Sequence, residues 1–123
     1  MKNLNKAIGS YGEKISKDYL INNGYIILDL NYRSRYGEID IICKLKDIIV
    51  FIEVKSRYNT LYGLPQESVT YFKQRRILNL CNYYIISKNL FNYNCRFDVI
   101  EVYFNTINND FKINHLKDSF RGY

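Results

Sequence analysis

Residues 37–55 read GEIDIICKLKDIIVFIEVK, and this stretch decides the fold. Two apolar runs of strand length flank Lys46-Asp47, which predicts a β-hairpin, although the pair lacks the glycine that favours tight turns. The second run, from Ile48 to Ile52, is apolar without alternation. A run of that kind is typical of a central strand that is buried on both faces.

Charged residues stand at the ends of both predicted strands. Because side chains alternate along a strand, Glu53 and Lys55 point to one face. If Lys46-Asp47 forms a two-residue loop, Leu45 pairs with Ile48. Asp40 then lies opposite Glu53, Glu38 lies opposite Lys55, and all four charged side chains share that face. Directly paired Cβ atoms are roughly 4.5–5.5 Å apart, so two carboxylates so placed can hold one cation between them.

Carboxylates at the end of a buried strand must be paired or bind a metal. Oxygen ligands favour Mg²⁺ or Mn²⁺ over zinc, and such a cation activates water and offsets charge on a phosphate. Lys55 would then orient or deprotonate that water and contact the phosphate. The alternative is a cross-strand ladder of salt bridges, with Glu38 against Lys55 and no metal. Spacing and burial alone leave both open.

Outward from this stretch, apolar periodicity and turn residues predict the remaining elements. A helix is expected over residues 4–23, before Asn23-Gly24, and a strand over 25–33. A second helix should run from Pro65 to about Ser87, followed by strands over 97–104 and 111–116 and a polar tail from about residue 117. The 123 residues fit one domain, with a mixed sheet flanked by helices, which is an α/β fold.

The composition favours an anionic partner, because the formal net charge is +6 and the pI is about 9.2. No signal peptide or membrane-spanning run is visible, and three widely spaced cysteines indicate reduced thiols, so we expect a cytoplasmic protein without membrane association. The basic residues that could line a phosphate-binding groove stand near strand ends and on the second helix. They are Arg33, Arg35, Arg57, Lys73 and Arg76. A solvated helix face is the alternative for the helical ones.

Several motifs resemble the bacterial YraN-like family in order and spacing, from about Gly9 to Val102. The matching residues are Gly12-Glu13, Asn31-Tyr32-Arg33, Gly37-Glu38-Ile39-Asp40, Phe51 to Arg57, Gly63 with Pro65, Lys73, and Arg96 to Ile100. That family is placed in the restriction-endonuclease-like, or PD-(D/E)xK, superfamily and is similar to archaeal Holliday junction resolvases. The resemblance implies a restriction-endonuclease-like αβββαβ core.

The resemblance also implies a site. Asp40, Glu53 and Lys55 stand at the catalytic positions, and Glu13 is the additional helix-borne carboxylate, so the metal ligands would be Asp40, Glu53 and Glu13. The departures are mild, since Ile39 stands where the superfamily name has proline and Ser16 where alanine is expected. We prefer a structural role for Arg96 and Asp98, and a solvent-facing or packed structural role for the single histidine, His115.

The expected function is therefore a Mg²⁺- or Mn²⁺-dependent endonuclease acting on nucleic acid, in particular DNA. Branched DNA and a homodimer are implied by the resolvase resemblance alone. Two other functions remain open at this point. One is a binding module of the same fold that holds nucleic acid without cleaving it, and the other is an interaction domain whose basic face docks on an acidic protein.

Overall fold

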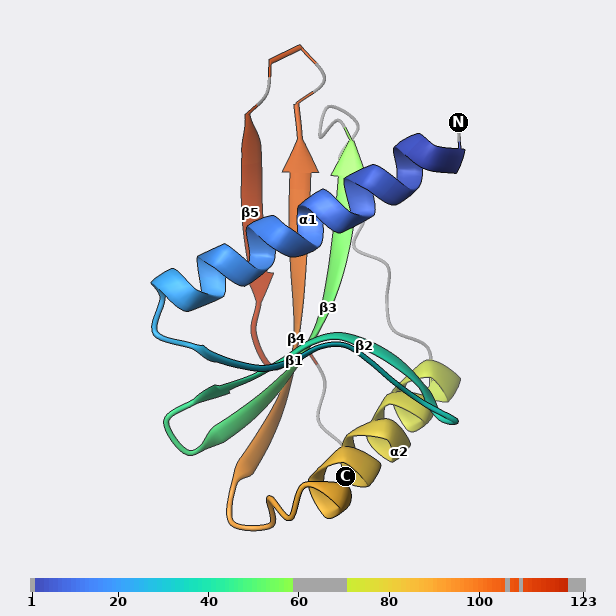
Figure 1. Cartoon of the computed structure of the whole chain (residues 1–123), viewed down its shortest axis with the longest axis vertical. Coiled ribbons are helices and arrows are strands. Elements are labelled where there is room, and N and C mark those ends of the chain that lie inside the picture. Colours follow the sequence, from blue (N-terminus) through green and yellow to red (C-terminus); the bar gives the residue numbers. More distant parts are fainter. Residues whose placement is uncertain (1, 59–70, 106, 109, 120–123) are drawn as a thin grey trace.

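The computed structural model describes residues 2–58, 71–105, 107–108 and 110–119 (Figure 1). Its elements follow the predicted order of one helix, three strands, one helix and two strands. They are α1 (Lys2–Asn22), β1 (Ile26–Ser34), β2 (Gly37–Leu45), β3 (Ile48–Tyr58), α2 (Tyr71–Ser87), β4 (Asn94–Phe104) and β5 (Phe111–Leu116). The predicted start of the second helix at Pro65 lies outside the described residues.

The five strands form one mixed sheet in the order β1-β2-β3-β4-β5. The first three strands pair antiparallel, β3 and β4 pair parallel, and β5 returns antiparallel to β4. The parallel pair is made by the crossover that contains α2. This arrangement confirms the mixed α/β sheet and is consistent with an αβββαβ core extended by one strand.

The helices cover opposite faces of the sheet. Ile15 and Leu20 of α1 pack on one face, in a buried cluster with Val50 and Ile52. Ile77, Leu80, Cys81 and Tyr84 of α2 pack on the other, with Ile49 and Phe51. Residues 49–52 are at most 1% exposed, so β3 is the central strand buried on both faces that the sequence predicted. Figure 1 shows α1 crossing β3, β4 and β5, and the curved β1–β2 hairpin reaching α2.

The register of the β2–β3 hairpin is confirmed up to the site. Leu45 pairs with Ile48, the pairing continues without a shift to Ile41 and Ile52, and Lys46 supplies the turn with a φ of 54°. The ladder then ends, and side-chain alternation breaks in β2. Ile39 and Ile42 both belong to the cluster on the α2 face, although residues three apart in a regular strand point to opposite faces.

The helix ends agree with the sequence, with one correction. After α1, Gly24 has a φ of 87°, and the amides of Gly24 and Tyr25 donate to the carbonyls of Ile21 and Leu20, which closes the helix in a Schellman motif. The apolar periodicity of the second helix places Phe72 on its apolar face together with Ile77 and Leu80, but Phe72 is 79% exposed, because it precedes the turn that packs on the sheet. Neither described helix is long and apolar enough to cross a membrane.

Candidate functional site

Asp40 lies where β2 separates from β3. Its Oδ2 accepts a hydrogen bond of 2.8 Å from the backbone amide of Val54, between Glu53 and Lys55. The expectation that Asp40 pairs across the ladder with Glu53, with all four charged residues on one regular face, is therefore wrong in detail. A side-chain contact replaces the backbone pairing, because alternation breaks between Ile39 and Ile42. Asp40 still lies close enough to Glu53 for their charges to interact.

Helix α1 brings Glu13 to this carboxylate. Gly12 is buried against β3, and a Cβ at this position would overlap the hydroxyl of Ser56. Ser16 is fully buried as well, and its Oγ donates to the carbonyl of Gly12 at 2.8 Å. The small residues allow close approach of the helix, so the Glu13 carboxyl lies near enough to Asp40 and Asn31 for both side chains to influence its pKa.

The sequence did not single out Asn31 as a site residue. Its backbone has a φ of 52°, in the left-handed region that asparagine tolerates better than most residues. A strand pattern carries no sign of such a conformation. The N-Y-R motif that contains Asn31 was the one available signal, since it belongs to the family resemblance.

Two of these carboxyl groups have raised pKa values. Burial raises the pKa of Glu13, and the nearby charges of Asp40 and Glu38 raise it further. Burial also raises the pKa of Asp40, against the hydrogen bond from Val54, and the charges of Glu53 and Glu38 add to the rise. The local field therefore opposes negative charge, and a bound cation would relieve it.

Glu53 lies two residues after Phe51 and so faces α2. Its Oε1 accepts from Nζ of Lys73, on α2, at 3.0 Å. Its Oε2 is buried and has no hydrogen-bond partner, which is costly for a carboxylate oxygen. Lys55 follows on the same strand, half-buried, on the same face as Glu53.

These donors fit a divalent cation in kind. All are carboxylate oxygens, as Mg²⁺ and Mn²⁺ prefer, and Oε2 of Glu53 is an orphaned acceptor on a carboxylate whose charge reaches Asp40. Within the described part of the chain, however, no three His, Cys, Asp or Glu side chains are already arranged to hold a metal ion. The ammonium of Lys73 takes one oxygen of Glu53 instead.

The predicted basic residues lie in two places, one around the β1–β2 turn and the start of α2, and the other at Arg57 on β3. Around the β1–β2 turn, Arg35 contacts the ring and hydroxyl of Tyr36, and the stem of Arg76 lies 3.7 Å from where a Cβ on Gly37 would be. Arg33, on the same hairpin, forms an ion pair of 3.2 Å with Glu38. Lys73 precedes Arg76 by one turn of α2 and contacts the carboxylate centre.

Arg57 is not part of that group. Its Nε lies 3.5 Å from Oε2 of Glu101 on β4, and the other oxygen of Glu101 accepts from Asn114 of β5 at 3.0 Å. Glu101 is only 2% exposed and pairs in register with Lys55. The sequence did not single out Glu101, because its partner Arg57 lies on β3, more than forty residues earlier in the chain.

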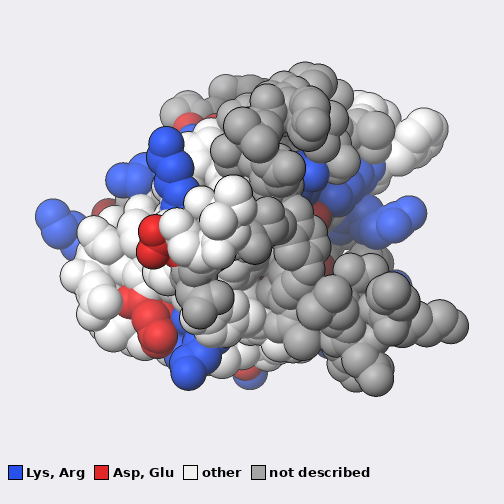
Figure 2. All heavy atoms as spheres, turned by 90° about the horizontal axis from the view of Figure 1, so that it is seen from above, with Lys and Arg blue, Asp and Glu red and all other residues white. Residues whose placement is uncertain are grey.

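The surface agrees with this separation. In the view of Figure 2, Lys and Arg side chains lie at several edges of the molecule, with Asp and Glu side chains between them. Among the described residues on that face, the basic side chains form separate groups.

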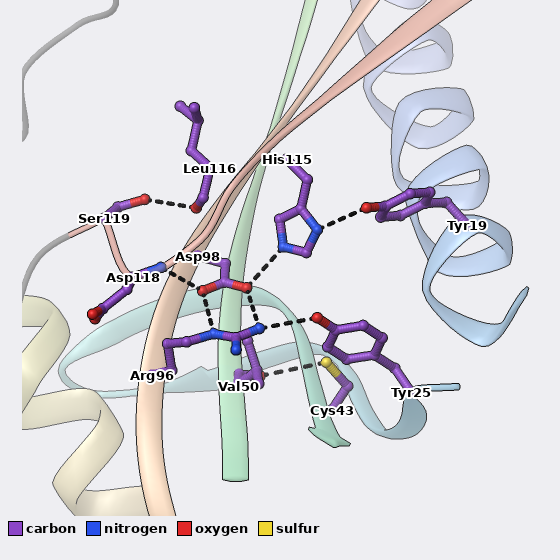
Figure 3. A network of polar contacts seen from close by, with 10 residues as sticks. All are labelled: Tyr19, Tyr25, Cys43, Val50, Arg96, Asp98, His115, Leu116, Asp118 and Ser119. Atoms are coloured by element: carbon purple, nitrogen blue, oxygen red, sulfur yellow. Dashed lines mark hydrogen bonds and ion pairs between the residues drawn. The ribbon is translucent and has the colours of Figure 1, made fainter. Parts of the chain in front are cut away.

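Asp98 is the centre of a buried network on the face of the sheet that α1 covers, opposite the face to which Glu53 points (Figure 3). Arg96 donates to both of its oxygens at 2.9 Å, His115 contacts Oδ2 at 2.8 Å, and the amide of Asp118 donates to Oδ1. The hydroxyl of Tyr19, on α1, forms a hydrogen bond with Nδ1 of His115 and extends the network. Although burial opposes its charge, these hydrogen bonds hold the pKa of Asp98 below its usual value.

The network gives Arg96 and Asp98 the structural role preferred from the sequence. His115 is packed rather than solvent-facing, with its side chain 5% exposed. The hydroxyl of Tyr25, just before β1, also accepts from Arg96, so the network joins α1, the segment before β1, β4 and β5. Cys43, Cys81 and Cys95 are all free thiols, as the sequence predicted.

Comparison with known proteins places the whole chain in one group. Residues 12–102 match the description "Uncharacterised protein family UPF0102". A UPF0102 protein of Clostridium beijerinckii is 56% identical over 121 residues, which cover 98% of each chain. UPF0102 proteins of Clostridium tetani and Clostridium perfringens are 53% and 51% identical, each covering 98% of this chain and 99% of the relative. The chain belongs to the uncharacterised protein family UPF0102, the YraN-like family that its motifs resemble.

Proposed function

We propose that this protein is a Mg²⁺- or Mn²⁺-dependent endonuclease that hydrolyses phosphodiester bonds in DNA. The observation that carries the proposal is the orphaned, buried Oε2 of Glu53, whose carboxylate lies near enough to Asp40 for their charges to interact. A buried carboxylate oxygen that has acidic neighbours and no hydrogen-bond donor is poorly stabilised unless a cation binds to it. The resemblance to resolvases extends the proposal to branched or otherwise structured DNA.

Each side chain then has a distinct task. Asp40 and Glu53 hold the cation, and Glu13 adds a third carboxylate from α1. When bound, the cation supplies a more acidic water and stabilises charge that develops on the phosphate. Lys55, on the same face as Glu53, orients or deprotonates the attacking water and contacts the phosphate. The amide of Val54 keeps the Asp40 carboxylate in place.

The strongest rival is a binding module of the same fold that does not cleave. The Lys73–Glu53 ion pair favours it, since the ammonium neutralises Glu53 without a metal. Such a module would hold nucleic acid through phosphate contacts that weaken steeply as the salt concentration rises. The two functions differ in turnover, so one experiment separates them.

The experiment is cleavage of labelled DNA and RNA substrates (single-stranded, duplex, flapped and four-way) with Mg²⁺ or Mn²⁺. Wild type is compared with Asp40→Asn and Lys55→Ala. Asp47→Asn serves as the matched control, because Asp47 is an exposed acid in the β2–β3 turn, at the other end of the hairpin. We expect metal-dependent cleavage by wild type and Asp47→Asn, and a loss of at least about a hundredfold in the other two.

The other outcomes are equally informative. Salt-sensitive DNA binding without cleavage of any substrate would replace the enzyme with the binding module. Cleavage that persists in both Asp40→Asn and Lys55→Ala would mean that a different site or a contaminant is responsible, and the assignment of these residues would be wrong.

A further inference from the structure

Lys73 lies at the junction between the acidic centre and the basic group at the β1–β2 turn. Its helix is fixed on the sheet by Ile77, Leu80 and Tyr84, so the side chain extends toward β3 from a stable position. Its Nζ reaches Oε1 of Glu53 at 3.0 Å, while 43% of the Lys73 side chain is exposed. The ammonium can therefore exchange between the carboxylate and the solvent side.

The ion pair balances only part of the negative charge. Glu53 receives one donor at Oε1, its Oε2 receives none, and the charges of Asp40 and Glu53 interact unfavourably. A divalent cation bound by these oxygens would lie close to the ammonium, and like charges at such distances repel. A cation bound at the centre therefore weakens the Lys73–Glu53 ion pair, and the ion pair weakens the binding of the cation.

We propose that Lys73 is a positioning residue whose ammonium holds Glu53 in the absence of a divalent cation. When the cation binds, the ammonium leaves Glu53 and contacts a phosphate of the substrate. The inference rests on the proposed function, since it assumes that the centre takes a cation. It adds a coupling between two binding events. DNA that captures the ammonium raises the affinity for the cation, and by reciprocity the cation raises the affinity for DNA.

The test measures Mn²⁺ binding to the intact protein, by the electron paramagnetic resonance signal of free Mn²⁺, without and with a non-cleavable phosphorothioate duplex. The variants are Lys73→Ala, Lys73→Gln and the conservative Lys73→Arg. Lys88→Ala is the matched control, because it removes the same charge just after the far end of the same helix. Thermal unfolding of each variant verifies that it is folded.

We expect Lys73→Ala and Lys73→Gln to bind Mn²⁺ more tightly without DNA, on the order of fivefold. Lys73→Arg and Lys88→Ala should resemble wild type. Addition of the duplex should tighten Mn²⁺ binding in wild type, and much less in Lys73→Ala. A lysine that only contacts phosphate would leave Mn²⁺ affinity without DNA unchanged.

Two results would overturn the inference, and they differ in what they say of the proposed function. If Lys73→Ala binds Mn²⁺ no more tightly than wild type, while Asp40→Asn binds none, the metal centre stands and the transfer of Lys73 is wrong. If neither wild type nor any Lys73 variant binds Mn²⁺, the metal-dependent function fails together with the inference.

Discussion

At the scale of single residues, Asp40 accepts a hydrogen bond from the Val54 amide while the charges of Glu53 and Glu38 oppose its own. The spacing correctly predicted that Asp40 and Glu53 lie near one another. It did not predict that Asp40 accepts the Val54 amide instead of pairing across the ladder. Nothing in the run Ile39-Asp40-Ile41-Ile42 signals the break, because the isoleucines on both sides of Asp40 fit a regular buried strand.

The raised pKa of Asp40 predicts how a neutral replacement behaves. Since the folded state favours the protonated carboxyl, this group's contribution to stability is present below the ordinary pKa of 3.8 and is lost as pH rises through the raised value. Asparagine copies the neutral form at every pH. We expect Asp40→Asn to raise the Tm of the metal-free protein at pH 7 by about 3 °C, and by less near pH 4.

Thermal unfolding followed by circular dichroism in EDTA, from pH 4 to pH 8, measures this difference. Asp47→Asn is the control, because Asp47 lies in the exposed turn and should show no such trend. A lower Tm for Asp40→Asn across the whole range would mean that the ionised carboxylate stabilises the fold, contrary to the direction of its pKa.

At the scale of elements, the helices and strands were largely predictable and their contacts were not. Apolar periodicity gave the order of the elements, and the hairpin register followed from the two-residue turn at Lys46-Asp47. Apart from the family resemblance, the sequence gives no sign that Glu13 faces the sheet, because Glu13 lies off the apolar stripe of α1. The approach of Gly12 to Ser56 turns that face toward β3, and this contact joins residues that are far apart in the sequence.

The close contact between Gly12 and Ser56 predicts that alanine substitutions at two glycines of α1 have opposite effects on stability. Alanine is the better helix former by roughly 1 kcal/mol, and a Cβ at Gly9 meets nothing within 4 Å, so Gly9→Ala should leave stability unchanged or raise it slightly. A Cβ at Gly12 overlaps the Ser56 hydroxyl. We expect Gly12→Ala to lower the free energy of unfolding by about 1–3 kcal/mol, measured by urea denaturation.

Ser56→Ala provides the matching test, because it removes the hydroxyl and leaves the Ser56 Cβ as the nearest atom, at 3.3 Å. In this background the cost of Gly12→Ala should fall by more than half, which a double-mutant cycle reports as coupling. An equal cost in both backgrounds would locate the damage elsewhere, in the helix itself.

At the scale of the whole molecule, the sequence predicted the layer architecture but not the distribution of charge. A net charge of +6 suggests a broad basic surface. Instead, Arg33 and Arg57 are bound by Glu38 and Glu101, and Lys73 is bound by Glu53. Net charge counts side chains without regard to their neighbours, and pairing of this kind depends on the fold.

The pairing leaves the β1–β2 turn with Arg35 and Arg76 as the best place for phosphate contacts, since both are exposed and flank Gly37. Neutralising one phosphate contact lowers the magnitude of the slope of log affinity against log salt by about 1. We therefore expect Arg35→Ala with Arg76→Ala to lower that magnitude by about 2. The control pair is Lys112→Ala with Lys117→Ala, which removes the same charge on and just after β5.

Fluorescence anisotropy of a labelled duplex in EDTA, between 50 mM and 200 mM salt, measures both slopes without cleavage. If the two pairs reduce the slope equally, DNA recognises the overall positive charge and no local surface, and the β1–β2 turn has no special role. If only the control pair has an effect, the contact surface lies on the β5 side of the sheet. DNA held there would be bound far along the sheet from the Asp40 carboxylate, and the binding surface would be separate from the proposed catalytic centre.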